Sequence, residues 1–216
     1  MLDLVTVTDP SSPVSEAYRT LRTNLSFYSV DEPLRTLVCA SAEPNEAQSE
    51  FVANLAVTMA QGGNSTILID ADLRKPSLHR MFDLDNTPGL TELLIDDTAR
   101  IPVQRTDINN LFVLTSGLKP PNPADLLGSK KVDAVMTKLQ ESADIVIINA
   151  PPIIAVTDTV VLGSKADGVL MVMTAGKSRR DHAERARDIL NKANVRIVGA
   201  SLTNAPREEL LDSYYG

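Results

Sequence analysis

The sequence has no tryptophan, a single cysteine and no excess of positive charge. Cys39 lies in the apolar run LVCA, so we interpret it as a small buried side chain in a protein of a reducing compartment. Its 21 Lys and Arg residues are outnumbered by 28 Asp and Glu residues, which gives a formal net charge of −7. Because no basic stripe offsets that charge, the composition argues against nucleic-acid binding as the main role.

Long apolar runs are also missing. None approaches the roughly 20 residues that a membrane-spanning helix needs. The opening stretch, MLDLVTVTDPSSP, has no positive flank and no long apolar segment, so it predicts neither a signal peptide nor an anchor. We therefore expect a cytoplasmic protein that reaches the inner face of the plasma membrane through a partner.

What the sequence does contain is an alternation of apolar strand-like runs with segments of helical period, typical of a parallel α/β sheet. The strand-like runs are TLVCA (36–40), TILID (66–70), LFVLT (111–115), IVIIN (145–149), GVLMVMT (168–174) and VRIVGASL (195–202). The helical segments span 49–61, 130–142 and 179–193. The pattern predicts one domain, 1–216, with a parallel sheet of six or more strands and helices on both faces.

A further helix is expected at the N-terminus, within residues 1–30. Ser12 and Pro13 form a typical helix start. The face carrying Glu16, Arg19 and Arg22 should be exposed, since three-residue spacing keeps them within a ~120° arc. The pattern alone favours a solvated face with local ion pairs. The opposite face collects Tyr18, Leu21, Leu25 and Tyr28.

The loop after the first strand, ASAEPNEAQSE, occupies the place of a nucleotide-binding loop between a strand and a helix. Such a loop needs glycines for backbone approach to phosphate, a lysine for charge and a hydroxyl for magnesium. Of these groups only the hydroxyl, that of Ser49, is present.

Several stretches resemble the bacterial tyrosine kinases of capsule and exopolysaccharide export, which are relatives of the deviant-Walker partition ATPases. EAYRTLRTNLSF (16–27) is similar to their leading helix and keeps the E-x-x-R-x-x-R oligomerisation motif. ILIDADLRKP (67–76) is similar to their second Walker motif, and VIINAPP (146–152) is similar to their Walker B motif. The resemblance covers nearly the whole chain and implies a P-loop NTPase-like fold.

The resemblance also implies roles for individual residues. Glu16, Arg19 and Arg22 become an oligomerisation motif that builds a homo-oligomeric ring. Asp70 and Asp72 fall at positions implicated in magnesium handling and in activation of the attacking tyrosine, and Ser49 would complete the magnesium ligands if nucleotide bound. Arg74 would border the nucleotide site. Asn149 replaces the Walker B aspartate, and Asp158 follows at the usual distance.

The Walker A position departs from the family pattern P-G-E-G-K-S-T. The corresponding residues are Pro44, Asn45, Glu46, Ala47, Gln48, Ser49 and Glu50. Asn45 can reach a left-handed conformation, but Ala47 adds a Cβ where the backbone should approach phosphate, and Gln48 supplies no charge. Losing the lysine together with loop amides should weaken nucleotide binding by ~100-fold or more, and catalysis further. No cofactor is expected, and Mg-ATP or Mg-ADP would bind weakly.

Three features leave alternatives open. Glu50 either holds the phosphate position with its carboxylate or is an exposed residue that starts the helix. In the tail, 206–216, Tyr214 and Tyr215 are candidate phosphoacceptors, for this chain or for an active tyrosine kinase relative, or they pack on a neighbouring surface. His79 and His182 have no partner at metal-ligand spacing and receive no metal role.

These observations lead to two functional hypotheses. The first is a catalytically impaired pseudokinase that acts as an oligomeric regulatory or scaffold subunit in exopolysaccharide or capsule biosynthesis and export, docked on a membrane co-polymerase or activator partner. The alternative is a weakly active ATP-dependent tyrosine autokinase or ATPase of the same pathway. A dinucleotide-binding oxidoreductase is disfavoured, because no G-x-G-x-x-G follows any predicted strand.

Overall fold

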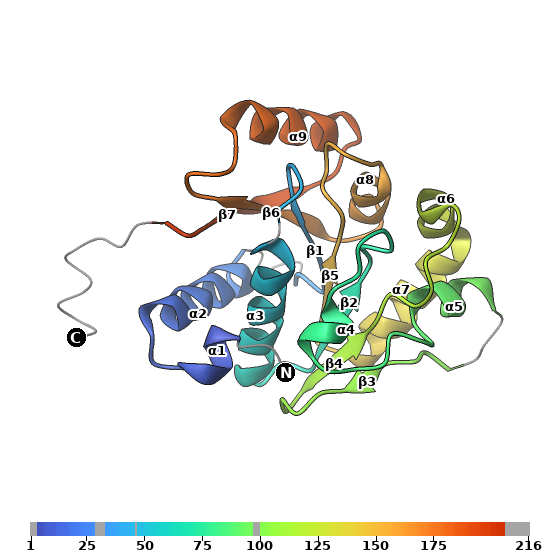
Figure 1. The fold of residues 1–216 in the computed structure, drawn as a ribbon, viewed down its shortest axis with the longest axis horizontal. Helices are drawn as coiled ribbons and strands as arrows, with labels where there is room; N and C mark the ends of the chain where they lie inside the picture. The colour runs from blue at the N-terminus through green and yellow to red at the C-terminus, as the bar shows by residue number, and fades with distance from the viewer. Residues whose placement is uncertain (1–3, 29–32, 46, 97–99, 206–216) are drawn as a thin grey trace.

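The computed structural model describes residues 4–28, 33–45, 47–96 and 100–205, and a seven-stranded sheet lies at its centre (Figure 1). The strand order is β3-β4-β2-β5-β1-β6-β7, with β3 antiparallel and the other six parallel. The strands are β1 (Thr36–Ser41), β2 (Thr66–Asp70), β3 (Gln104–Arg105), β4 (Leu111–Leu114), β5 (Ile145–Asn149), β6 (Gly168–Thr174) and β7 (Ile197–Thr203). The six predicted strands are confirmed. β3 was not predicted, because two residues are too short for a period to register.

Helices cover both faces of the sheet, as the apolar runs predict (Figure 1). One face carries α1 (Val5–Thr8), α2 (Pro13–Ser26), α3 (Ala47–Gln61) and α4 (Leu78–Met81). The other carries α5 (Leu90–Ile95), α6 (Pro123–Gly128), α7 (Lys130–Ser142), α8 (Asp158–Gly163) and α9 (Arg180–Lys192). The four long helices match the predicted segments, and α4 contains His79, where a short helix was expected. The other short helices, α1, α5, α6 and α8, were missed because they span less than two helical turns.

Side chains along each strand alternate between the two faces of the sheet, which divides the apolar core into two clusters. In β1, Val38 and Ala40 join the apolar cluster under α5 to α9, whereas Leu37 and Cys39 join the cluster under α1 to α4. Successive side chains of a strand point to opposite faces, so a strand buried on both sides must be apolar at every position. Cys39 is fully buried, as expected.

The N-terminal helix α2 begins as predicted, with Pro13 in its first turn and the Ser12 hydroxyl accepting a hydrogen bond from the Ser15 N–H (3.2 Å). Its charged face is only partly exposed, which corrects the expectation of a solvated face. Arg22 donates to the carbonyl of Thr58 (3.1 Å) at the end of α3. A side chain at Gly62 would place its Cβ 2.6 Å from the Arg22 guanidinium, so the glycine permits this close packing.

The other two charged residues of that face pair with each other, since the Arg19 guanidinium contacts the Glu16 carboxylate. Arg19 also donates to the carbonyl of Pro10 (2.5 Å). No helix in the described parts of the chain is long and apolar enough to cross a bilayer.

Parallel pairing brings polar residues together at the carboxyl edge of the sheet. Asp70 ends β2 and Asn149 ends β5, and the two are register partners. Ser41 and Thr174 end β1 and β6, the next two strands along the sheet. This edge is where open α/β sheets bind their ligands, so it is the place to look for a functional site.

Candidate nucleotide-binding site

Gln48, at the position of the phosphate-binding lysine, folds its side chain into the protein. It is 5% exposed. Its Oε1 accepts a hydrogen bond from the Ser41 N–H (2.6 Å), and its Nε2 donates to Asn149 Oδ1 (2.9 Å) and to the carbonyl of Ala150 (2.6 Å). Both amide protons and the amide oxygen are therefore used by the protein itself.

Asn149, at the Walker B position, continues this set of contacts. Its Nδ2 donates to the Ser49 hydroxyl (3.2 Å) and to Asp70 Oδ1 (3.2 Å). Gln48, Ser49, Asp70 and Asn149 thus form one connected cluster, which we term the amide network. It joins α3 to the carboxyl ends of β2 and β5. A neutral amide pair stands where a lysine and an aspartate are found in the resembled kinases.

The start of α3 is closed by Asn45. Its Oδ1 accepts from the Ala47 N–H (3.1 Å), and its carbonyl oxygen accepts from the Gln48 N–H (3.2 Å). Its Nδ2 donates to the Thr174 hydroxyl (2.8 Å) on β6. Helix N-terminal N–H groups attract anions only while they lack partners, and these two already have them.

Asn45 does not adopt the left-handed conformation that its side chain would allow. Positive φ angles among the described non-glycine residues belong to Asp83, Asn110, Asn194 and Asn204. The Asn45 side chain caps α3 at the position where the family's loop has a glycine. The loop residue Glu46 lies outside the described residues.

Asp70 is fully buried at the centre of the amide network. Its Oδ2 accepts from the N–H groups of Ser77 and Leu78 (2.9 Å each). Burial raises the pKa of Asp70 to about 6, even though these hydrogen bonds and the one from Asn149 favour the charged form. The desolvation of the carboxylate is the larger effect.

Asp72 and Arg74 stabilise the chain that follows β2. Asp72 Oδ1 accepts from the N–H groups of Arg74 (3.1 Å) and Lys75 (2.9 Å), which forms a local turn. Arg74 makes a two-pronged contact with the fully buried Asp158, Nε to Oδ2 at 2.9 Å and NH2 to Oδ1 at 3.0 Å. That hydrogen bonding raises the pKa of Arg74. The sequence placed Asp158 near the Walker B motif but did not identify Arg74 as its partner.

A second link holds the loop from the side of α9. The Glu43 carboxylate accepts from the Arg179 N–H (3.0 Å) and lies 2.5 Å from His182 Nδ1. The hydrogen bonds from Arg179 and His182 lower the pKa of Glu43. No group of three or more His, Cys, Asp or Glu side chains in the described parts could hold a metal ion.

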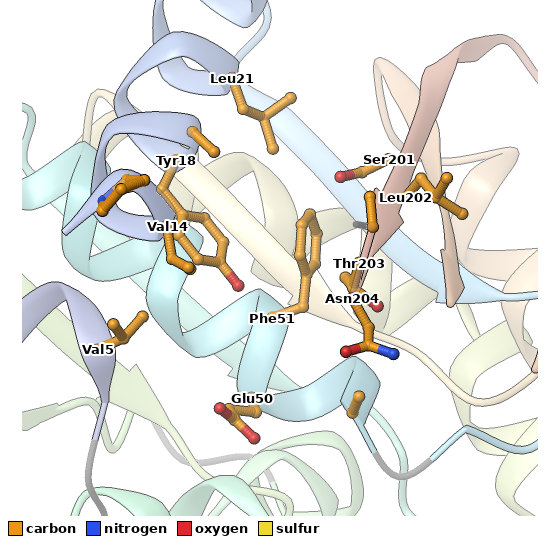
Figure 2. Close-up of a pocket in the computed structure, with 14 residues that line it drawn as sticks. Val5, Val14, Tyr18, Leu21, Glu50, Phe51, Ser201, Leu202, Thr203 and Asn204 are labelled. Atoms are coloured by element: carbon orange, nitrogen blue, oxygen red, sulfur yellow. The ribbon is translucent and has the colours of Figure 1, made fainter. Parts of the chain in front are cut away.

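Glu50 lies in the first turn of α3 and lines a groove on the α2 side of that helix, together with Tyr18 and Phe51 (Figure 2). Among the described residues, no hydrogen bond of the Glu50 carboxylate supports the hypothesis that it takes the phosphate position. The candidate phosphoacceptors Tyr214 and Tyr215 lie outside the described residues.

The amide network predicts that Gln48 is needed for stability. Gln48→Leu leaves the Ser41 N–H and the Asn149 Oδ1 buried without partners, so we expect a loss of about 2–3 kcal/mol in the free energy of unfolding. Urea denaturation of nucleotide-free protein measures it. Gln140→Leu, a partly exposed position on α7, is the matched control, and equal losses in the two variants would contradict the network.

The raised pKa of Asp70 predicts a pH-dependent stability. A folded-state pKa above the ordinary 3.8 means that the stabilising contribution of protonated Asp70 is complete below about pH 3.8 and lost as pH rises through about 6. Asp70→Asn removes this dependence. The free energy of unfolding of the Asp70→Asn variant, relative to that of the native chain, should therefore rise by about 1 kcal/mol between about pH 5.5 and about pH 7.5. Denaturation curves compare it with Asp107→Asn, at an exposed site, and parallel curves for Asp70→Asn and the native chain would contradict the assignment.

Comparison with known proteins agrees with the fold. Residues 36–204 match the ParA family model, described as NUBPL iron-transfer P-loop NTPase. The tyrosine-protein kinase YwqD of Bacillus subtilis (strain 168) is 41% identical over 216 residues, which cover 99% of this chain and 91% of YwqD. The crystal structure of the chimerical protein CapA2B2 is similar with a TM-score of 0.90 and 33% identity, over 94% of this chain and 90% of that one.

The kinase domain of the Escherichia coli tyrosine kinase Etk is also similar in structure, with a TM-score of 0.91 and 29% identity over 97% of this chain and 82% of that domain. The fold, the matched family model and these relatives agree with one another. The chain belongs to the bacterial tyrosine-protein kinase family, within the ParA-like P-loop NTPases.

Proposed function

We propose that this chain is a pseudokinase of its family, a regulatory or scaffold subunit in exopolysaccharide or capsule biosynthesis and export. The observation that carries the proposal is the amide network around Gln48 and Asn149. The resemblance to the kinases of capsule and exopolysaccharide export suggests the pathway, and the relatives are named as tyrosine-protein kinases or putative tyrosine-protein kinases, such as YwqD and CapB.

The residues at the phosphate position do not fit a triphosphate. The side chain that replaces the lysine is neutral, buried and hydrogen-bonded to Asn149 and Ala150. The N–H group of Ser41 donates to Gln48, and the N–H groups of Ala47 and Gln48 donate to Asn45. Binding an anion there requires breaking these contacts without gaining a positive charge, so the nucleotide-free form is favoured.

The proposal leaves the chain two tasks that need no chemistry, namely assembly into a ring and docking on a membrane co-polymerase or activator at the inner face of the membrane. Glu16, Arg19 and Arg22 are the residues proposed for assembly. The CapA2B2 chimera supports pairing with a second protein, since it joins parts named for two proteins in one chain.

An alternative function has its own supporting observation. Ser49 and Asp70, two of the side chains assigned to magnesium, both contact Asn149 at 3.2 Å and so lie close together. A weak ATP-dependent tyrosine autokinase would use them with Asp72, and Tyr214 and Tyr215 would be its acceptors. Titration with nucleotide separates the two functions.

Titration calorimetry with Mg-ATP and with Mg-ADP tests the proposal. We expect the native chain to bind at least ~100-fold more weakly than a variant that restores the loop, Asn45→Gly, Ala47→Gly and Gln48→Lys, combined with Asn149→Asp. The last change supplies a counter-ion for the buried ammonium group.

The matched control is the same variant without Asn149→Asp, which should be less stable and bind less tightly than the full set of changes. Micromolar binding by the native chain would overturn the pseudokinase proposal. It would make autophosphorylation of the tail the next assay.

The assembly proposal is tested by sedimentation velocity. Arg19→Ala should shift the chain towards monomer while changing the free energy of unfolding by no more than about 1 kcal/mol, because its partner Glu16 is partly exposed. Lys138→Ala removes an equal charge from the exposed side of α7 and should leave assembly intact. A native chain that stays monomeric at high concentration contradicts the proposal.

A second variant, Arg22→Ala, differs from Arg19→Ala in its expected effect on the stability of the monomer. Because Arg22 donates to the Thr58 carbonyl, Arg22→Ala should also destabilise the monomer by about 1 kcal/mol. Urea denaturation of the dissociated variants distinguishes the two residues.

A further inference from the structure

A groove of about 520 Å³ separates α2 from the end of β7, with the first turns of α3 as its floor (Figure 2). It borders the amide network at the first turn of α3, where Ala47 and Glu50 line it, but no residue of the network is among its lining residues. Its walls are largely apolar. Val14 on α2 is 44% exposed, which is unusual for a large apolar side chain, whereas the side chain of Leu202 on β7 points away from α2 (Figure 2).

Among the described residues that line the groove, Glu50 is the one with a charged side chain. Tyr18 lines the groove together with Glu50. Burial raises the pKa of Tyr18, and the negative charge of Glu50 adds to that rise. The groove therefore fits a segment that offers apolar side chains and one cation. The residues that line it are Val5, Pro13, Val14, Ala17, Tyr18, Leu21, Ala47, Glu50, Phe51, Ser201, Leu202, Thr203, Asn204 and Ala205.

The chain itself supplies such a segment. Ala205 lines the groove and is followed by PREELLDSYYG, residues 206–216. These residues include one cation, Arg207, and the adjacent leucines Leu210 and Leu211. Two residues span at most about 7 Å, so Arg207 starts beside the groove that holds Glu50.

We propose that the groove between α2, α3 and β7 binds residues 206–216 of the same chain, with Arg207 paired to Glu50 and the two leucines on the apolar walls. The segment begins at the groove, so its effective concentration there is in the millimolar range and even a weak contact is occupied. Occupation of the groove would restrict the access of other proteins to Tyr214 and Tyr215. This inference does not depend on the proposed function, because it requires neither nucleotide nor a ring.

The chain allows a clean chemical test, because its cysteine, Cys39, is fully buried. Ser201→Cys places a thiol in the groove, on β7, where Figure 2 shows the Ser201 hydroxyl directed towards α2. Its rate of reaction with a small aromatic disulfide reports whether the groove is covered. Ser142→Cys, exposed at the end of α7 and on the opposite face of the sheet, is the control for thiol reactivity.

We expect the Ser201→Cys thiol to react about 10-fold more slowly in the full chain than in a full chain that also carries Leu210→Asp and Leu211→Asp. The Ser142→Cys thiol should react equally fast in both. Ser213→Asp, which adds a charge to the tail without removing an apolar side chain, should keep the slow rate.

The ion pair is tested by a charge exchange. Arg207→Glu alone and Glu50→Arg alone should each speed the reaction about 3-fold, and the two together should restore the slow rate. Equal rates with and without the leucine changes would overturn the proposal. Protection that grows with protein concentration would also overturn it, and would assign the groove to the tail of a second copy.

Discussion

The hydrogen bonds of one buried amide, that of Gln48, hold the functional end of the molecule together. They connect the end of β1, the end of β5 and the start of α3, and Asn149 extends them to Asp70 on β2. A buried polar cluster is stable only when each member finds a partner. A lysine at position 48 would bring a positive charge that the neutral Asn149 side chain cannot neutralise. Gln48 in place of the lysine and Asn149 in place of the Walker B aspartate are therefore compatible with each other.

The same edge of the sheet keeps charged residues that the resembled kinases use, but each is given a structural contact. Asp70 accepts two backbone hydrogen bonds at the start of α4, and Asp72 closes the following turn. Arg74 pairs with Asp158, the first residue of α8. An intact second Walker motif is therefore compatible with a role in folding, because its carboxylates organise the backbone between β2 and α4 without a nucleotide.

Individual strands and helices show which parts of the fold could be predicted from the sequence and which could not. The six parallel strands were predictable because strands buried on both faces are apolar at every position, and the long helices because their periods extend over three turns or more. The antiparallel β3 and the short helices carry too few residues to show a period. The partly buried state of Arg22 was missed, since its partner is a backbone carbonyl of α3 that leaves no pattern in the side-chain sequence.

By itself, the sequence determined the α/β sheet, the site at the carboxyl edge of its strands, and the loss of glycines and lysine from the loop. Those features follow from local periodicity and from residue types at fixed spacing. Only the tertiary structure decided that Gln48 turns inward to Asn149, a hundred residues away, and that Asn45 caps α3. Hydrogen bonds between distant segments depend on how the strands are ordered, and the groove beside Glu50 likewise exists only where α2, α3 and β7 converge.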